Sequence, residues 1–242
     1  MLTGTKTISA QDSRDISSTQ QETLGAKAYT KDGRVYRYAK AGTSALTVGT
    51  MNEQSAIVAN HSNIAVYAAA VAGATEVKAT LGATLATKDQ YAQGYMLVND
   101  AAGEGIAYLI KGHAAVASAG VIEVQLEEPL KVALTTSSEV TFVANPYKGV
   151  IVVPSAATSG GVPVGVSNVA VTAAYYGWLQ SGGVCAMLSG TTPQTLGDQV
   201  SQEASGVAGS ASPAVATCPI YGTALQLGVA TEYQLVMLTL DS

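Results

Sequence analysis

Three glutamates lie close together near the middle of the chain, at Glu123, Glu127 and Glu128. Two carboxylates that flank a glycosidic bond can act as general acid and as base or nucleophile in glycoside hydrolysis. Glu123 and Glu127, however, fall on the polar face of the alternating stretch 121–127, where acidic side chains are usually solvated. We therefore expect no enzyme, and a carbohydrate-active β-sandwich remains a third hypothesis.

Other groups capable of chemistry do not form a motif. His61 and His113 lack the second histidine or the paired cysteines that a zinc site needs at close spacing. The GxSxG element of serine hydrolases and the glycine-rich phosphate loops GxxxxGKS/T and GxGxxG do not occur. We expect each histidine to lie in a turn or at the surface, and we expect no catalytic residue, no metal and no cofactor.

Two weaker possibilities concern oxygen ligands and thiols. Asn99, Asp100 and Glu104 place oxygen atoms in one turn, but they lack the ligand spacing of an EF-hand, and Asx-turn hydrogen bonds are the simpler explanation. Cys185 and Cys218 could form one disulfide. We expect them instead to be small buried thiols, as in most proteins that are not secreted.

Composition excludes several classes of partner. Of the 242 residues, 12% are charged, against roughly 25% in ordinary soluble domains. The net charge of -5 argues against nucleic-acid binding, which needs a basic surface. The longest apolar run, 64–74, is too short to cross a bilayer, and the first residues lack the apolar core of a secretory signal. We expect neither a nucleic-acid nor a membrane partner.

Two clusters could make contacts with other proteins. A hairpin is predicted around Asp32-Gly33, and Tyr36 and Tyr38 share one face of it. The hairpin carries the only basic cluster of the sequence. This cluster is either a solvated strand edge or a docking site for an acidic partner. For an aromatic cluster farther along the chain, we expect packing in the core, and a subunit interface is the alternative. The basic cluster comprises Lys27, Lys31, Arg34, Arg37 and Lys40, and the aromatic cluster comprises Tyr175, Tyr176 and Trp178. The candidate interface residues are Arg34, Tyr36, Arg37, Tyr38, Tyr175, Tyr176 and Trp178.

The elements that position these residues are strands. Short stretches such as 95–98 and 139–144 alternate apolar and polar residues, and the stretch 233–240 is apolar on both faces, as in a central strand. The best helix candidate is 83–91. We predict a mainly β chain with little helix, built from two β-sandwich or β-barrel units and an extended N-terminal arm. No convincing internal repeat is visible.

The predicted boundaries follow composition along the chain. Residues 1–23 are polar without a sustained apolar period and read as an arm that a partner would order. A β domain over 24–154 follows. The small, uncharged stretch 155–162 reads as a linker, so that 155–242 forms a C-terminal β-barrel-like domain.

Several phrases resemble virion structural proteins of tailed bacteriophages that are encoded near capsid genes. The matching stretches are 25–42, 80–83 with 89–91, 94–100 with 103–105, 129–138, 145–147 and 175–178. The ending at 232–240 also resembles the strand that closes the β-barrel of head-decoration proteins. These stretches carry no catalytic residue.

The resemblance implies a capsid cement or decoration protein that binds the major capsid protein on the capsid exterior and stabilises the shell. It implies a homotrimer at local three-fold positions of the virion, assembled in the host cytoplasm. The arm before Thr23 and the hairpin 27–40 would contact the capsid, and 175–178 would contact neighbouring protomers. The alternative is a tail or baseplate component or a receptor-binding adhesin of the same β build.

Overall fold

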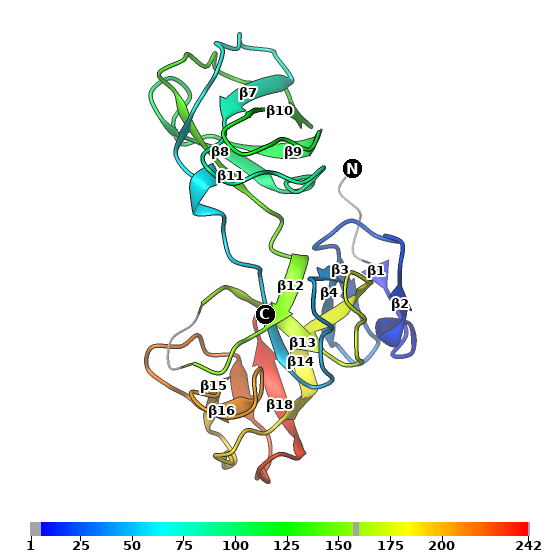
Figure 1. The fold of residues 1–242 in the computed structure, drawn as a ribbon. Coiled ribbons are helices and arrows are strands. Elements are labelled where there is room, and N and C mark those ends of the chain that lie inside the picture. Colours follow the sequence, from blue (N-terminus) through cyan, green and yellow to red (C-terminus); the bar gives the residue numbers. More distant parts are fainter. Residues whose placement is uncertain (1–5, 157–159, 242) are drawn as a thin grey trace. The chain divides into compact units, whose positions relative to one another are not determined.

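The computed structural model describes residues 6–156 and 160–241, and these residues form strands β1 to β18 with two single-turn 3-10 helices and no α-helix (Figure 1). The mainly β prediction is confirmed, and the sheets close or nearly close into barrels. The chain divides into two compact units. Unit 1 comprises Met1–Ala56 with Pro146–Ser242, and unit 2 comprises Ile57–Asn145.

This division differs from the expected boundaries at 24–154 and 155–242. Unit 2 is inserted into unit 1, so the chain crosses between units at Ala56 and again before Pro146. The described part of the expected linker, 155–156 with 160–162, joins two strands of the same unit, and 157–159 lie outside the described residues. The reason is that small, Gly-rich stretches join strands within a barrel as readily as they join domains.

Unit 2 is a small antiparallel barrel. Its sheet runs in the order β6-β11-β8-β9-β10-β7, and an isolated bridge between Val66 and Ala79 brings its two edges together. The strands are β6 (Ile64–Ala65), β7 (Glu76–Thr80), β8 (Tyr95–Asp100), β9 (Ala107–His113), β10 (Val121–Leu126) and β11 (Glu139–Val143). Alternation with period two turns Ile122, Val124 and Leu126 inward, as predicted.

The two histidines are buried in unit 2, which corrects the expectation of a surface position, although His61 does lie in a turn. His61 is the last residue of η2 (Ala59–His61), is fully buried, and bonds the Tyr91 hydroxyl through Nδ1 and the Thr84 carbonyl through Nε2 at 2.9 Å. His113 Nε2 accepts from the Tyr91 backbone N–H at 3.0 Å. Every ring nitrogen thus has a structural partner.

The helix candidate 83–91 is also wrong. The segment forms turns around Ala86, whose backbone pairs with Val116 at 2.8 and 2.9 Å. It is too short to nucleate a stable helix, and the Ala86 pairing draws it into the barrel wall.

The first half of unit 1 is a closed ring of five strands. The order β4-β12-β5-β13-β14 returns to β4 because β14 also pairs with β4. β12 pairs with β4 in parallel, and the other neighbours are antiparallel. The strands are β4 (Val35–Ala41), β5 (Met51–Glu53), β12 (Lys148–Val152), β13 (Pro163–Ser167) and β14 (Tyr176–Leu188). Small residues such as Ala39, Ala41 and Val150 fill the narrow interior.

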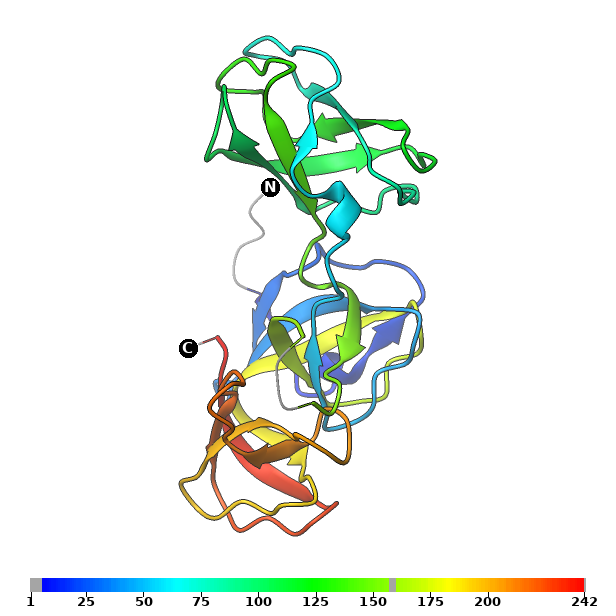
Figure 2. The same ribbon diagram turned by 60° about the vertical axis from the view of Figure 1, so that its left-hand side comes forward.

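The second half of unit 1 uses the continuation of β14. Its sheet order is β14-β18-β17-β15-β16, and a bridge from Ser189 to Ala211 nearly closes it (Figure 2). The strands are β15 (Gln199–Gln202), β16 (Ala211–Pro213), β17 (Gly222–Ala224) and β18 (Tyr233–Thr239). Its core includes Cys185, Met187, Val236 and Leu238. The long β14 therefore belongs to both halves.

The N-terminal residues that the structure describes are ordered by their own unit, which corrects the expectation that a partner orders the arm. β1 (Lys6–Thr7) pairs in parallel with β3 (Lys27–Tyr29), and β2 (Ile16–Ser17) pairs with β14. Between them lies η1 (Asp12–Arg14). Ile8 and Leu24 are buried. Two apolar residues are enough to anchor a segment whose other residues are mostly polar.

A structural motif recurs where sequence comparison shows no convincing repeat. Three isolated antiparallel bridges pair Leu46 with Val171, Ala70 with Leu134 and Ala86 with Val116. In the first pair, the backbone N–H of each residue donates to the carbonyl of the other, at 2.9 and 3.1 Å. The repeat escapes detection because it amounts to little more than one apolar residue before a turn, as in Ala45-Leu-Thr47 and Ala133-Leu-Thr135.

Candidate interaction surface

The outer face of β14 and β18 in unit 1 is apolar and exposed. Along β18, residues alternate strictly between buried and exposed, so Tyr233, Leu235 and Met237 point outward with 53%, 41% and 38% of their surface accessible. On β14, Val184 lies opposite Met237 and is 40% exposed. Across the strands, such neighbours form one continuous patch. We call this patch, with Ala186, Leu225 and Leu227, the apolar face.

The apolar face carries no charge of its own. Neither 183–188 of β14 nor 233–239 of β18 contains Asp, Glu, Lys or Arg. The face extends past β17, where the Leu225 backbone N–H donates to the Leu235 carbonyl at 2.9 Å and Leu227 is 69% exposed. A contiguous patch of exposed apolar side chains is typical of contact sites with other proteins.

The sequence predicts part of this arrangement. The stretch 233–240 is apolar on both faces, and β18 is indeed a central strand, between β14 and β17. Its inner face packs in the core through Val236 and Leu238, but its outer face has no covering layer among the described residues. The double-sided apolar pattern was therefore a signal for a contact surface as well as for a central strand.

A basic groove adjoins the apolar face. It has a volume of about 320 Å³ and shares Ala186 and Tyr233 with the face, while Arg14 and Arg34 supply its charge. Among the residues that the structure describes, no acidic side chain lines it, although Arg34 Nε donates to Asp32 at 2.9 Å beside it. Two guanidinium groups next to an apolar patch suit the carboxylate of a partner at the rim of a contact.

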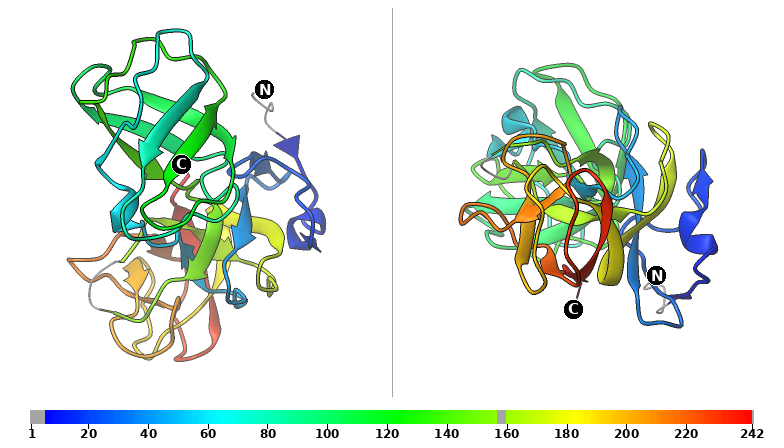
Figure 3. Two further views of the ribbon diagram at one scale, coloured as in Figure 1. Left: turned by 45° about the horizontal axis from the view of Figure 1, so that its top comes forward. Right: turned by 90° about the horizontal axis from the view of Figure 1, so that it is seen from below.

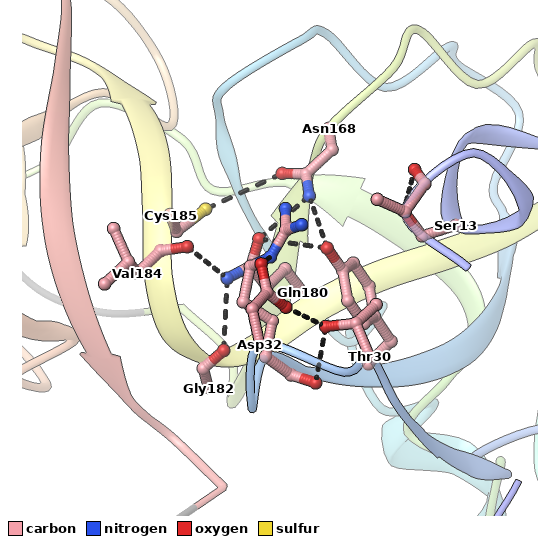
Figure 4. Close-up of polar contacts among 11 residues, drawn as sticks. Ser13, Thr30, Asp32, Asn168, Gln180, Gly182, Val184 and Cys185 are labelled. Atoms are coloured by element: carbon pink, nitrogen blue, oxygen red, sulfur yellow. Dashed lines mark hydrogen bonds and ion pairs between the residues drawn. The ribbon is translucent and has the colours of Figure 1, made fainter. Parts of the chain in front are cut away.

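A buried amide network forms the floor of this groove (Figure 4). Asn168 Nδ2 donates to Gln180 Oε1 at 2.8 Å and to the Tyr36 hydroxyl at 3.3 Å. Gln180 Nε2 donates to the carbonyls of Gly182 at 3.1 Å and Val184 at 2.8 Å. These bonds hold β14 at the irregularity after Gln180, where it passes from one half of unit 1 to the other. The network is structural, and it fixes the direction of the apolar face.

Three of the predicted interface residues are buried within the chain. Tyr36, Tyr38 and Trp178 are 0%, 3% and 6% exposed. Tyr38 lies opposite Trp178 across β4 and β14, and the two rings meet edge to face with centroids 5.1 Å apart. Ile8 and Leu24 pack on the same cluster. These three therefore do not form a surface open to a partner in a single copy, because the chain's own N-terminal segment covers them.

The two remaining aromatic candidates, Tyr175 and Tyr176, are half-buried. Tyr175 packs at the edge of the core inside the five-stranded ring. The Tyr176 ring stacks on Tyr38 with centroids 6.0 Å apart and lies 5.1 Å from the Lys40 ammonium. Their packing role is evident, and their role in a protomer contact stays a prediction.

The two arginine candidates lie in ion pairs. Arg37 binds both carboxylate oxygens of Asp241, through Nε at 2.5 Å and Nη2 at 2.8 Å. Lys27 Nζ lies 3.6 Å from the same carboxylate, and Arg34 pairs with Asp32. Two carboxylates of the same unit, Asp241 and Asp32, thus offset part of the charge of the five-residue basic cluster, which weakens its attraction for an acidic partner.

The other groups singled out from the sequence are not brought together. Glu123 pairs with Lys78 at 3.0 Å on the outside of unit 2, and the side-chain oxygens of Asn99 and Asp100 accept hydrogen bonds from Thr141 and the Ala101 backbone. Within the described ranges, no group of three or more His, Cys, Asp or Glu side chains could hold a metal. Cys185 and Cys218 are both buried and form no disulfide with each other, as expected.

Comparison with known proteins adds no relative. No family model, no curated protein and no solved structure matches the chain. In addition, none of the helices described here is long and apolar enough to span a membrane.

The Arg37–Asp241 pair gives unit 1 a pH-dependent contribution to stability. Hydrogen bonds from Arg37 and Ser181 and the charges of Arg37 and Lys27 lower the pKa of Asp241 from 3.8 to about 2, against the opposing effect of burial. Because the folded state favours the carboxylate, this contribution is complete above the unfolded pKa and is lost as pH falls from 3.8 toward 2. We expect Asp241→Asn to unfold at lower urea concentration than wild type at about pH 6 and to match wild type near about pH 2.

Urea midpoints of unit 1 across this window check the prediction. Asp15→Asn, which neutralises an exposed carboxylate on the N-terminal segment, serves as the control and should keep the wild-type pH profile. A constant gap between Asp241→Asn and wild type down to the lowest pH would contradict the assignment.

Proposed function

We propose that this chain is a structural protein of a tailed-bacteriophage virion, of the capsid cement or decoration type. In this proposal it binds the major capsid protein on the capsid exterior, stabilises the shell and associates into a homotrimer. The proposal joins the resemblance of the sequence to virion proteins with a surface suited to assembly.

The observation that carries the proposal is the apolar face on β14 and β18. Burying exposed apolar surface contributes about 25 cal/mol per Å², so a face of this kind favours association. We take a second copy as the partner of this face. Two chains of net charge -5 repel each other, and a patch free of charged residues is where that repulsion opposes association least.

Association of the copies would also strengthen the attachment of each copy to the shell. A protomer that contacts both its copies and the shell converts weak single contacts into multivalent attachment, because each later contact forms at high effective concentration. The groove with Arg14 and Arg34 would then receive a carboxylate at the edge of such a contact. Closed cyclic symmetry is the usual outcome for identical chains that associate in solution.

The test is to locate the protein in virions of the phage that encodes it. Purified particles are analysed by quantitative mass spectrometry, and a specific antibody is then visualised on negatively stained particles. We expect the chain in a fixed ratio to the major capsid protein and the antibody on the shell. Label confined to the tail or baseplate would favour the alternative, a tail component or receptor-binding adhesin. Absence from purified virions would overturn both.

A further inference from the structure

The N-terminal segment lies on the outside of the five-stranded ring and is attached by short contacts. Figure 3 shows this segment, dark blue, running along the outside of unit 1. Its pairings are two residues long at each end: Lys6 and Thr7 with β3, and Ile16 and Ser17 with β14. Between them, Ile8 is the apolar anchor, 5% exposed, against the cluster of Tyr38 and Trp178.

The segment also has an internal organisation of its own. The Ser9 backbone N–H donates to Asp12 at 3.0 Å, and the Asp12 backbone N–H donates back to Ser9 Oγ at 3.0 Å. Ser13 Oγ donates to the Ala10 carbonyl at 2.9 Å. These bonds lie within 6–17, so the segment has a turn of its own in addition to its contacts with the barrel.

The seam between segment and barrel is only partly filled. Two open grooves run along it, one of about 460 Å³ lined by Ile8, Ala10, Thr30 and Arg34, and one of about 220 Å³ lined by Ile16 and Trp178. Between the two pairings, η1 packs on β14 and Ser13 is buried. The segment is therefore held by its two short pairings, by Ile8 and by Ser13.

We propose that residues 6–17 exchange between copies, so that in the assembled protein the segment of one chain covers the Tyr38–Trp178 cluster of its neighbour. The site is complementary to this segment because the same contacts already exist within one chain. An exchange keeps every one of them, and association raises the effective concentration of the neighbour's segment. The inference rests on the proposed function in needing a second copy at hand.

The connection between residues 6–17 and the rest of unit 1 is long enough for the exchange. Residues 18–23, between β2 and the buried Leu24, are mostly exposed. Six residues extend to roughly 20 Å, enough to reach a chain in direct contact. A heterologous exchange of this kind, each chain covering the next, closes into a ring and fits a trimer.

An engineered disulfide between β2 and β14 shows whether residues 6–17 pack on their own chain or on a neighbouring chain. Ile16 pairs with Gly177, and a Cβ on Gly177 would lie 3.5 Å from Ile16 Cγ2 and 3.4 Å from Val171 Cγ2, both ordinary contacts. The full-length variants Ile16→Cys and Gly177→Cys, one with a larger tag, are coexpressed, purified, oxidised and run on non-reducing gels. We expect a mixed disulfide joining the two chains in most molecules, since their cysteines meet only when the segment is exchanged.

The double variant Ile16→Cys/Gly177→Cys gives the complementary result. Exchange predicts covalent dimers and trimers, whereas a disulfide at monomer mass together with no mixed disulfide overturns the proposal. The pair Ser17→Cys and Tyr176→Cys, adjacent in register, repeats the measurement, and failure of both double variants to oxidise also overturns it. Each single variant alone shows whether Cys185 or Cys218 cross-links.

Light scattering on the same samples separates the two proposals. A trimer whose disulfides close within each chain refutes the exchange and leaves the proposed assembly intact. A monomer at every concentration, with disulfides within the chain, refutes the exchange and removes the support that self-association gives to the proposed function.

Discussion

Replacing Leu235 and Met237 with lysine should convert an associating protein into a monomer. Both side chains point outward from β18 and are about 40% exposed, so the folded unit can accept lysine there. In a contact between copies, the same change would bury two charges without partners. Mass by light scattering over a range of concentrations measures the effect.

The size of the effect follows from the cost of burying charge. One truncated interface anchor commonly costs about 2 kcal/mol or more, and an unpaired buried charge costs at least as much. Two substitutions should therefore weaken association by more than roughly 100-fold, which corresponds to about 2.8 kcal/mol. The double variant should also be lost from assembled shells, because multivalent attachment fails when the protomers no longer assemble.

A matched control separates this effect from added charge alone. Val71→Lys with Leu85→Lys introduces the same two charges at apolar residues of unit 2 that are 73% and 54% exposed. This variant should keep the wild-type mass. If both double variants dissociate equally, charge repulsion explains the loss. If neither does, the apolar face is not the contact between copies.

The strands of unit 2 were predictable because their information is local. In β10 and β11, apolar and polar residues alternate over five or six positions, and one buried face dictates that pattern. The hairpin of β3 and β4 was equally readable, since Asp32-Gly33 marks its turn and Gly33 adopts a φ of +82°.

The topology was not predictable, because its partners are distant in sequence. The five-stranded ring closes where β4 pairs with β14. The hydrogen bond between Tyr36 and Gln180, for example, joins residues that are 144 positions apart in the sequence. The alternating pattern of a strand does not indicate which other strand it pairs with when many strands share that pattern. The insertion of unit 2 escapes for the same reason, although Pro146 marks the point where the chain returns to unit 1.

For the candidate site, residue type alone was a misleading guide. Aromatic residues at 36, 38 and 178 have the composition of an interface, but the segment that covers them contributes few apolar residues, including Ile8 and Leu24, and looked like a free arm. The apolar face was readable in principle from 233–240. Whether the second apolar side of a strand meets a core layer or solvent is decided by the fold.

A second large effect is expected in unit 2, where Phe142→Ala should destabilise the barrel by about 3–5 kcal/mol. Phe142 is the single Phe of the chain, is 2% exposed on β11, and its ring lies 5.5 Å from that of Tyr91. Removing it leaves a cavity in the core of unit 2, opposite Met96 on β8, and surrounding side chains relax only partly into such a cavity. For a barrel of this size the loss corresponds to a fall in melting temperature of more than about 10 °C.

The two units make this prediction specific, because they have separate hydrophobic cores. Calorimetry of the full chain should show two transitions, and Phe142→Ala should lower only the one that belongs to unit 2. Leu85→Ala, at a residue that is 54% exposed, should leave both within about 0.5 kcal/mol of wild type. A single transition that moves as a whole in Phe142→Ala would mean that the inserted barrel and its host unfold together. In that case the two connections at Ala56 and Pro146 would transmit stability between two cores that share no residue.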